Sequence, residues 1–381
     1  MRIVIAVDSF KGCMASDEAG EIIAVGLREG LRDAEIVVIP MADGGEGTTD
    51  AVVRATGGEM RSVPVTGPLG DPEMAVYGWL TDGQTAVMEM ASASGIELVP
   101  AGKQDPMMAT TFGTGELIRA AIEDGAREIV VGIGGSATVD GGIGMAQALG
   151  YRLLTADGVE CGRGGAALET IRTIDSTDVV EGLTDCRIRV ACDVTNPLLG
   201  DRGAARIFGP QKGATPEMVE ELERGLDHLG EVWKAHEMLE SVEHPGDGAA
   251  GGLGAALRAF CRAEIVSGAD LVAEISGFDE QIRDADFLVT GEGRTDAQTA
   301  DGKLPAVLAD KARAAGAKAL LISGAVTGDL GEVNELFDGI YATVDEGVPL
   351  EDALAHGREN LAATAKRVGR TLAIDSLRVV S

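Results

Sequence analysis

Basic and aromatic side chains are both scarce in this sequence. Lys and Arg number 32 against 62 Asp and Glu, which gives a formal net charge of −30, and aromatic residues make up 3% of the chain. The acidic balance argues against nucleic acid or an anionic membrane surface as a partner, because phosphate contacts need clustered Lys and Arg. It fits either a high-salt cytoplasm or a GC-rich genome. With so few aromatics, Ala, Val, Ile and Leu must supply most of the core packing.

Cysteine and long hydrophobic runs are also limited. The five cysteines are scattered, without a CxxC or a Cys/His spacing, so we expect neither a zinc site nor a disulfide framework. No apolar run approaches the ~18 residues of a membrane span, and the start of the chain, MRIVIAVDSF, reaches an acidic residue too early for a signal peptide. We therefore expect a soluble, cytoplasmic protein. We also expect it to be a monomer or a homodimer.

Histidine is rare as well. The four histidines stand at positions 228, 236, 244 and 356, outside the polar loops described below. A histidine-based triad or proton shuttle is therefore not expected. Polar chemistry must come from carboxylates, Lys, Arg, Ser, Thr and backbone amides.

Both ends of the chain show the alternation that is typical of parallel α/β sheets. The first 57 residues predict strands over 2–7 and 34–41, a helix over 16–31 with Ser16 as its N-cap, and a helix over 48–56. Near the C-terminus the expected elements are a strand followed by a loop over 285–296, a helix over 304–316, strands over 318–325 and 337–345, and a helix over 350–373.

The middle of the chain has a different sequence pattern. Residues 60–95 alternate apolar and polar side chains around Pro-Gly turns, which predicts antiparallel hairpins. Residues 215–239 predict an amphipathic helix. Its apolar stripe, which we expect to be core or interdomain packing, is Met218, Leu222, Leu226, Leu229 and Trp233. We therefore expect two domains: a discontinuous α/β domain over 1–60 plus 285–381, and an inserted mixed α/β domain over 61–284.

Glycine is abundant, at 54 residues, and gathers in short loops that mostly follow predicted strands. In open parallel sheets, ligands bind outside the carboxyl ends of the strands. We therefore expect several loops to share one site. These loops are DSFKG (8–12), ADGGEG (42–47), GIGGSATVDGG (132–142), CDVTNP (192–197), GDGAAGGLGAAL (246–257) and GEGRTDAQTADGK (291–303).

The loop over 132–142 fits more than one phosphate-binding pattern. Residues 132–137 match a GxGxxA dinucleotide fingerprint, with Asp157 at the distance of a ribose-binding acid, but Gly141 and Gly142 interrupt the helix that this motif should open. A nucleotide-dependent dehydrogenase stays an alternative, as does a non-enzymatic acidic binding protein. The loop is also similar to the GLGSSA loop of galactokinase-type kinases, whose fold the flanking residues fit poorly. A Walker A loop is absent, because the GK at 302–303 is followed by Leu.

Carboxylates, cations and glycine amides together suit phosphoryl transfer from a nucleotide. Backbone amides and cations can hold phosphates, carboxylates can hold Mg²⁺, and one carboxylate can lie near the acceptor hydroxyl.

Nine motifs support a more specific interpretation. In chain order they are VDSFKG (7–12), MADGGEGT (41–48), VTGPLG (65–70), GTGELI (113–118), GIGGSATVDGG (132–142), ACDVTNPLLG (191–200), FGPQKGA (208–214), GAAGGLGAAL (248–257) and GEGRTDAQTADGK (291–303). Together they resemble the bacterial glycerate kinase family (type I) over nearly the whole chain.

The resemblance implies ATP- and Mg²⁺-dependent phosphorylation of D-glycerate at the 2-hydroxyl. It also implies two α/β domains, one flavodoxin- or Rossmann-like and one mixed, with the site in the cleft between them. The sequence departs from the family where Val7 replaces Pro and Val139 replaces Asn. We therefore expect no side-chain ligand at position 139, while the backbone role of the loop is unaffected.

The loop residues have expected roles in this chemistry. The expected catalytic residues are Asp193, as the base near the acceptor hydroxyl, with Lys11 and Arg294 as charge partners. The expected Mg²⁺ ligands are Asp43 and Glu46. The expected nucleotide ligands are Gly134, Gly135, Ser136, Thr138, Asp140, Lys212, Glu292 and Asp296, and the expected substrate ligands are Asp8, Ser9, Asn196 and Lys303. Each has a structural alternative as a turn cap, a helix-dipole partner or an exposed charge.

Overall fold

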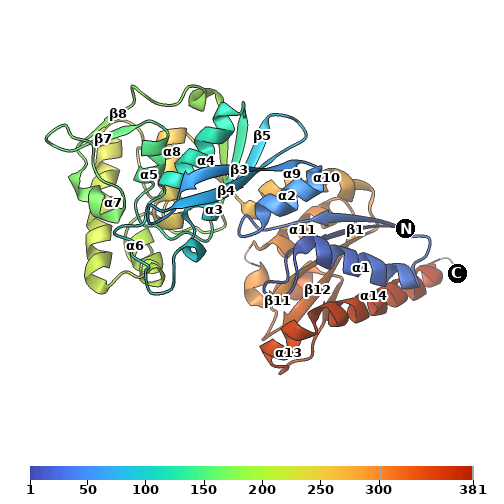
Figure 1. Ribbon diagram of the computed structural model, residues 1–381. Coiled ribbons are helices and arrows are strands. Elements are labelled where there is room, and N and C mark those ends of the chain that lie inside the picture. Colours follow the sequence, from blue (N-terminus) through green and yellow to red (C-terminus); the bar gives the residue numbers. More distant parts are fainter. Residues whose placement is uncertain (301, 380–381) are drawn as a thin grey trace. The chain divides into compact units, whose positions relative to one another are not determined.

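The computed structural model describes residues 1–300 and 302–379, with side chains through Ile374 (Figure 1). The chain forms two compact units. Unit 1 comprises Met1–Asp43, Asp50–Thr56 and Ala269–Ser381, and unit 2 comprises Gly44–Thr49 and Gly57–Gly268. Each unit is described by itself below.

Unit 1 is built on a five-stranded parallel sheet. Its strands are β1 (Arg2–Val7), β2 (Glu35–Pro40), β11 (Phe287–Thr295), β12 (Lys318–Val326) and β13 (Gly339–Ala342), in the order β2-β1-β11-β12-β13. This order corresponds to the 2-1-3-4-5 order of flavodoxin-like sheets, in which ligands bind where the first and third strands diverge. The expected parallel sheet from both ends of the chain is confirmed, and its switch point lies between β1 and β11.

Helices accompany this sheet along the chain. They are α1 (Ser16–Gly30), α2 (Thr48–Thr56), α9 (Gly268–Ile275), α10 (Phe278–Gln281), α11 (Leu304–Ala314), α12 (Val333–Leu336), α13 (Leu350–Ala355) and α14 (Gly357–Val379), with 3-10 turns η6 (Ile282–Asp284) and η7 (Ala297–Ala300). The single helix expected over 350–373 is therefore two helices. Ser16 is the first helical residue rather than the N-cap. The cap position is Ala15, without a side-chain cap bond, so the predicted Ser16 cap is wrong.

Helices α1 and α14 lie side by side (Figure 1) because small residues face each other. A Cβ built on Gly26 would lie 2.6 Å from Ala365 Cβ, and one on Gly30 would lie 2.5 Å from the carbonyl carbon of Gly369. Only glycine permits these approaches. The close packing holds the C-terminal helix against the segment that follows β1.

Unit 2 contains a six-stranded mixed sheet. Its strands are β3 (Glu59–Thr66), β4 (Pro72–Trp79), β5 (Thr85–Glu89), β6 (Glu128–Gly132), β9 (Arg187–Ala191) and β10 (Glu264–Val266), in the order β10-β9-β6-β5-β4-β3. The pairs β3–β4 and β4–β5 are antiparallel, as the hairpin prediction for 60–95 required, and the other pairs are parallel. A separate antiparallel pair joins β7 (Arg152–Leu154) to β8 (Thr173–Asp175).

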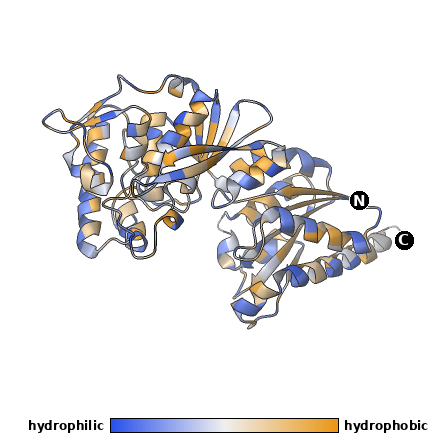
Figure 2. Cartoon of the chain, viewed as in Figure 1, coloured by the Kyte–Doolittle hydropathy of each residue, from blue (hydrophilic) through white to orange (hydrophobic). Residues whose placement is uncertain are grey.

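The helices of unit 2 connect these strands. They are α3 (Ala91–Ser94), α4 (Phe112–Glu123), α5 (Ile143–Ala148), α6 (Ala204–Phe208), α7 (Pro216–Ala235) and α8 (Leu253–Cys261), with 3-10 turns η1 (Ile96–Leu98), η2 (Gly165–Thr170), η3 (Leu183–Asp185), η4 (Pro210–Lys212) and η5 (Ala249–Gly251). Helix α7 carries polar and apolar residues side by side (Figure 2), and the Thr215 hydroxyl caps its start by accepting a hydrogen bond from Met218 N. Leu222, Leu226, Leu229 and Trp233 are fully buried, so these four members of the predicted stripe are confirmed as core. Met218 is half-buried and packs against that core.

Candidate functional site

Three carboxylates gather at the switch point of the unit 1 sheet. Asp8 directly follows β1, Asp43 lies just after β2, and Glu292 is part of β11. Asp8 N donates to Gly291 O at 2.9 Å, which extends the strand pairing to this edge. Burial, together with the negative charges of Asp43 and Glu292, raises the pKa of Asp8 to about 7. The carboxyl edge of this sheet therefore concentrates negative charge.

Glu292 is held by two hydroxyl groups that the sequence analysis did not single out. Its Oε1 accepts hydrogen bonds from Thr295 Oγ1 at 2.8 Å and Thr299 Oγ1 at 2.7 Å, and the residue is 8% exposed. Burial raises the pKa of Glu292, and the two hydroxyl donors oppose that shift. The two hydroxyl donors satisfy one oxygen of this buried carboxylate and fix the orientation of the side chain. The sequence offered one signal, since both threonines lie in the polar loop that contains Glu292.

The loop after β1 lies against β11 at a glycine. A Cβ on Gly293 would lie 3.4 Å from Lys11 N, and one on Gly324 in β12 would lie 2.3 Å from Gly293 O. Gly12 turns the chain back with a φ of +77°. Lys11 is therefore brought to the same sheet edge as Glu292, with an exposed side chain. Ser9 contributes its backbone, because Ser9 N donates to Asp8 Oδ1 at 2.6 Å.

Arg294, Asp296 and Lys303 form a charge cluster beside this edge, in which Arg294 is exposed and the other two are half-buried. Arg294 Nε lies 3.9 Å from Asp296 Oδ2 and donates to Thr327 Oγ1 at 3.2 Å. Lys303 Nζ lies 4.0 Å from Asp296 Oδ1. Exposed pairs of this kind contribute ~0–1 kcal/mol to stability, so stability alone gives little reason for the cluster.

In unit 2, a buried lysine holds the glycine-rich loop that follows β6. Lys212 is 2% exposed, and its Nζ donates to Ser136 Oγ at 2.6 Å and to Thr138 O at 2.7 Å. Burial lowers the pKa of Lys212 to about 7, against the opposing attraction of Asp140. The sequence predicted Lys212 and the loop as separate phosphate ligands. The structure brings them together across 76 positions of the chain.

The backbone of the loop is partly engaged and partly exposed. Ala137 N donates to Ser94 O at 2.9 Å, and Gly135 O accepts from Ile96 N at 2.8 Å. Gly134 and Gly135 are exposed, and within the described ranges their amides have no protein acceptor. Such amides can receive an anion. Thr138 is fully buried, so its side chain faces the interior and its carbonyl serves Lys212.

Asp140 shapes the loop from inside. It is fully buried and accepts hydrogen bonds from Thr111 N at 2.8 Å, Thr111 Oγ1 at 2.9 Å, Gly142 N at 3.0 Å and Gly144 N at 3.4 Å. Burial raises the pKa of Asp140, and these donors lower it. Thr111 Oγ1 also accepts from Met145 N at 2.9 Å, in the first turn of α5. Thr111, which the sequence analysis missed, therefore joins the loop to the helix that follows it.

Replacing Thr111 with Val should lower the free energy of unfolding by about 1–3 kcal/mol, because it removes two buried hydrogen bonds, one of them to a carboxylate. Urea denaturation measures the effect. Thr173→Val, at an exposed position in β8, is the matched control and should change little. An unfolding free energy of Thr111→Val equal to that of the control would show that this network does not hold the loop.

Further polar residues lie at the carboxyl ends of β5, β9 and β10. Glu89 accepts hydrogen bonds from Thr49 N at 2.8 Å and Gly47 N at 3.2 Å, and burial raises its pKa, with the Glu46 charge acting in the same direction. Asp193 Oδ1 accepts from Gly268 N at 2.9 Å. Glu89 was missed from the sequence because its partners are 40 or more positions away.

The glycine-rich segment before α8 packs on the phosphate-loop candidate. Gly141 N donates to Gly251 O at 3.0 Å, and a Cβ on Gly251 would lie 2.0 Å from Thr138 O. Asn196 O accepts from Gly248 N at 2.9 Å, while its side chain donates to Arg202 O at 2.7 Å. Three of the predicted loops, over 132–142, 192–197 and 246–257, are therefore neighbours within unit 2.

The dinucleotide alternative does not fit this geometry. After β6 the helix α5 starts at Ile143, not at the first glycines, and Gly141 and Gly142 have φ values of +58° and +71°. The helix N-terminus that should receive a pyrophosphate is therefore missing from the fingerprint. Among the residues that the structure describes, no group of three or more His, Cys, Asp or Glu is arranged to hold a metal ion by itself.

Within residues 1–300 and 302–379, no helix is long and apolar enough to cross a membrane. The family model described as "Glycerate kinase family" matches residues 3–373. The chain is 47% identical to glycerate 2-kinase of Escherichia coli (strain K12) and 44% identical to glycerate kinase of Bacillus subtilis (strain 168), each over 375 residues that cover 98% of both chains. The crystal structure of a Salmonella typhimurium LT2 protein, provisionally named glycerate kinase 2, superposes with a TM-score of 0.91 at 44% identity and covers 99% of each chain. The chain therefore belongs to the glycerate kinase family.

Proposed function

We propose that the protein is an ATP-dependent kinase that transfers the terminal phosphoryl group to the 2-hydroxyl of D-glycerate. The observation that carries this proposal beyond family membership is the buried Lys212 ammonium on the glycine loop, beside two exposed amides without protein acceptors. A cation combined with exposed loop amides suits the phosphates of a nucleotide.

The nucleotide phosphates are proposed to bind Gly134 N, Gly135 N and the Ser136 hydroxyl, with Lys212 supplying positive charge. Asp140 is proposed as a positioning residue, because its carboxylate is already occupied by four loop and helix donors. Thr138 acts through its carbonyl on Lys212 in this proposal. Asp296 and Glu292 remain proposed nucleotide-side residues in unit 1.

We propose that a magnesium ion binds at the acidic edge of the unit 1 sheet together with nucleotide phosphates and water, because the carboxylates described there do not form a metal site by themselves. Burial and the negative charges of Asp43 and Glu292 raise the pKa of Asp8 there, and oxygen ligands combined with water are what Mg²⁺ prefers. When bound, the ion would neutralise charge on the nucleotide phosphates. Asp43 and Glu46 stay the proposed ligands from the sequence, and Asp8 and Glu292 are added as neighbours of Asp43. Glu46 has Glu89 as its acidic neighbour in unit 2.

The acceptor side of the reaction is assigned to Asp193 and a set of polar groups. The Asp193 carboxylate takes the proton of the glycerate 2-hydroxyl as that oxygen bonds to phosphorus, and the bond from phosphorus to the bridging oxygen breaks to release ADP. Lys11 and Arg294 are proposed to balance the phosphoryl charge. Ser9, Asn196 and Lys303 are proposed to bind glycerate, with Asp8 as a further candidate. Four further expectations stay predictions: a cleft between two domains, a cytoplasmic location, the absence of nucleic-acid partners, and a monomeric or dimeric state.

Asp193→Asn should lower kcat by about 10²- to 10⁴-fold, the range typical of a lost general base. Asn keeps an oxygen that can accept from Gly268 N, so the loop should keep its shape. A coupled assay of ADP release measures the change, with Asp201→Asn at an exposed position as the matched control. A fully retained kcat would remove the base assignment.

Ligand-induced thermal shifts test the proposed function without any assumption about individual residues. ATP with Mg²⁺ and D-glycerate should raise the melting temperature, because ligands that bind only the folded state stabilise it. NAD should have no effect. Stabilisation by NAD, with none by ATP and Mg²⁺, would contradict the kinase proposal.

A further inference from the structure

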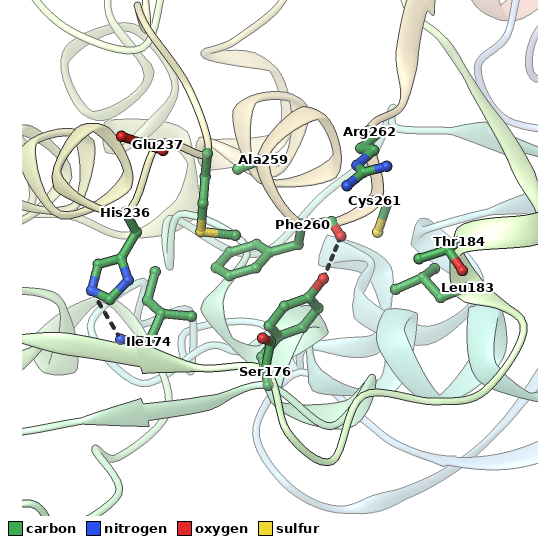
Figure 3. A pocket seen from close by; sticks show the side chains of 12 residues that line it. Ile174, Ser176, Leu183, Thr184, His236, Glu237, Ala259, Phe260, Cys261 and Arg262 are labelled. Carbon is green, nitrogen blue, oxygen red and sulfur yellow. Dashed lines mark hydrogen bonds between the residues drawn. The ribbon is translucent and has the colours of Figure 1, made fainter.

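A pocket of about 330 Å³ lies in unit 2 apart from the loops described above (Figure 3). It is formed by the β7–β8 pair, the η3 turn and the C-terminal ends of α7 and α8. Thr184 comes shortly before β9, and Arg262 shortly before β10. The pocket therefore lies at the amino ends of these strands, whereas Asp193 and the glycine loop follow the carboxyl ends of β9 and β6. It is not part of the proposed phosphoryl-transfer site.

Part of the pocket lining is apolar, beside a larger share of polar surface. Tyr151, Ile174 and Met238 are only partly buried although they pack against the main core of this unit. The Tyr151 ring lies 4.8 Å from the Phe260 ring, centroid to centroid, and its hydroxyl donates to Phe260 O at 2.7 Å. A fixed aromatic ring, an aliphatic side chain and an adaptable thioether make a surface for a flat apolar group.

Arg262 supplies an uncompensated positive charge at the rim. Its side chain is exposed, and in the described part of the chain its guanidinium has neither a hydrogen-bond acceptor nor a carboxylate partner, although the chain carries 62 acidic residues. The residue ends α8 in a left-handed conformation, with a φ of +54°. Glycine is the usual residue at such a helix end. With arginine at this position the left-handed conformation is strained, and the guanidinium is placed at the pocket.

Other hydrogen-bond donors share the rim. His236 Nε2 accepts from Ile174 N at 3.3 Å, which leaves the proton of the neutral imidazole on Nδ1. Figure 3 shows Arg262 and Thr184 on one side of the Phe260 ring and His236 and Glu237 on the other. Among the described non-glycine residues, only Glu237, Ala250 and Arg262 have positive φ, and Glu237 and Arg262 both line this pocket. Backbone strain of this kind tends to concentrate at functional sites.

We propose that this pocket is a second ligand site, which binds a small carboxylate with a flat apolar body. The carboxylate pairs with the Arg262 guanidinium, whose planar donors match its two oxygens. The apolar body lies on Tyr151, Ile174 and Met238. The pocket volume is within the range of small-molecule sites.

Calorimetric titration of the full chain with 2-naphthoate tests the proposal, with 2-naphthamide as the uncharged analogue. The wild-type protein should bind 2-naphthoate at one site and 2-naphthamide at least roughly tenfold more weakly. Arg262→Gln should weaken 2-naphthoate binding by a similar factor, and Arg262→Lys should retain part of it. Arg119→Gln, on the surface of α4, is the matched control and should leave binding unchanged.

A glycine variant separates ligand binding from folding. Arg262→Gly relieves the left-handed backbone, so it should melt no lower than the wild type and still bind 2-naphthoate at least as weakly as Arg262→Gln does. Binding should persist with saturating ATP, Mg²⁺ and D-glycerate. Absent binding at millimolar 2-naphthoate, unchanged affinity in Arg262→Gly, equal affinity for the amide, or competition by the substrates would each overturn the proposal. These readouts do not depend on turnover, so they are independent of the kinase assignment.

Discussion

Lys212→Met should lower kcat/KM by about a hundredfold to a thousandfold, the loss typical of one preorganised electrostatic group in an active site. Lys212 is the buried cation on the glycine loop, and its two hydrogen bonds link that loop to the η4 turn. Methionine has a similar volume without the charge, so the core can stay packed. Steady-state kinetics in ATP and in D-glycerate measure the change.

The pH dependence of this variant gives a second readout. The pKa of Lys212 is lowered from 10.5 to about 7 by burial. Between these values the unfolded chain binds one more proton than the folded chain, so the free energy of unfolding of the wild type rises with pH across this window. Lys212→Met should lose that rise. Nucleotide phosphate near the ammonium should restore its charge, so ATP binding at pH 8 should take up a proton in the wild type and not in the variant.

Lys234→Met, at an exposed position on α7, is the control for Lys212→Met and should match the wild type in both measurements. Full activity of Lys212→Met, together with unchanged proton uptake on ATP binding, would show that Lys212 is only a structural lysine.

Asp8→Asn should lower kcat about a hundredfold and yet raise the melting temperature at pH 8. Burial raises the pKa of Asp8 from 3.8 to about 7, with Asp43 and Glu292 contributing. The folded chain therefore holds more protons than the unfolded chain between pH 4 and 7, and the free energy of unfolding falls as pH rises through this window. The variant should lack this fall, because its amide does not titrate.

Magnesium distinguishes a binding role of Asp8 from simple charge repulsion. Mg²⁺ should raise the melting temperature of the wild type at pH 8, and Asp8→Asn should respond less. Asp33→Asn, at an exposed position outside the sheet edge, should behave as the wild type does. An Asp8→Asn variant with wild-type kcat and an unchanged Mg²⁺ response would remove Asp8 from the site.

The fold was predictable where local pattern decides structure. The strand β1 and the helix α2 have the expected bounds. The ends of β2 differ from the expected ones by one residue each, and those of α7 by one and four residues. Each of these segments carries its own apolar run or amphipathic period. The prediction of Ser16 as the N-cap was wrong because the helix begins at Ser16 itself, one residue earlier than the capping pattern indicates. The loop expected from residue 291 begins later, because pairing with β12 extends β11 to Thr295.

The candidate site was predictable as a set of loops but not as a network. Glycine-rich strand ends identified the loop over 132–142, Lys212 and Asp140. The partners that hold them come from far along the chain: Thr111 bonds to Asp140 from 29 positions away, and Glu89 bonds to Thr49 from 40. These hydrogen bonds cannot be predicted from a local segment, because the partners meet only when strands distant in the sequence have paired.

Proton-coupled phosphorus NMR of the product from ATP, Mg²⁺ and D-glycerate tests the central claim most directly. Transfer to the 2-hydroxyl places the phosphate on a carbon with one hydrogen, so the new resonance should be a doublet. A triplet would place the phosphate on the 3-hydroxyl, and release of inorganic phosphate alone would contradict glycerate as the acceptor.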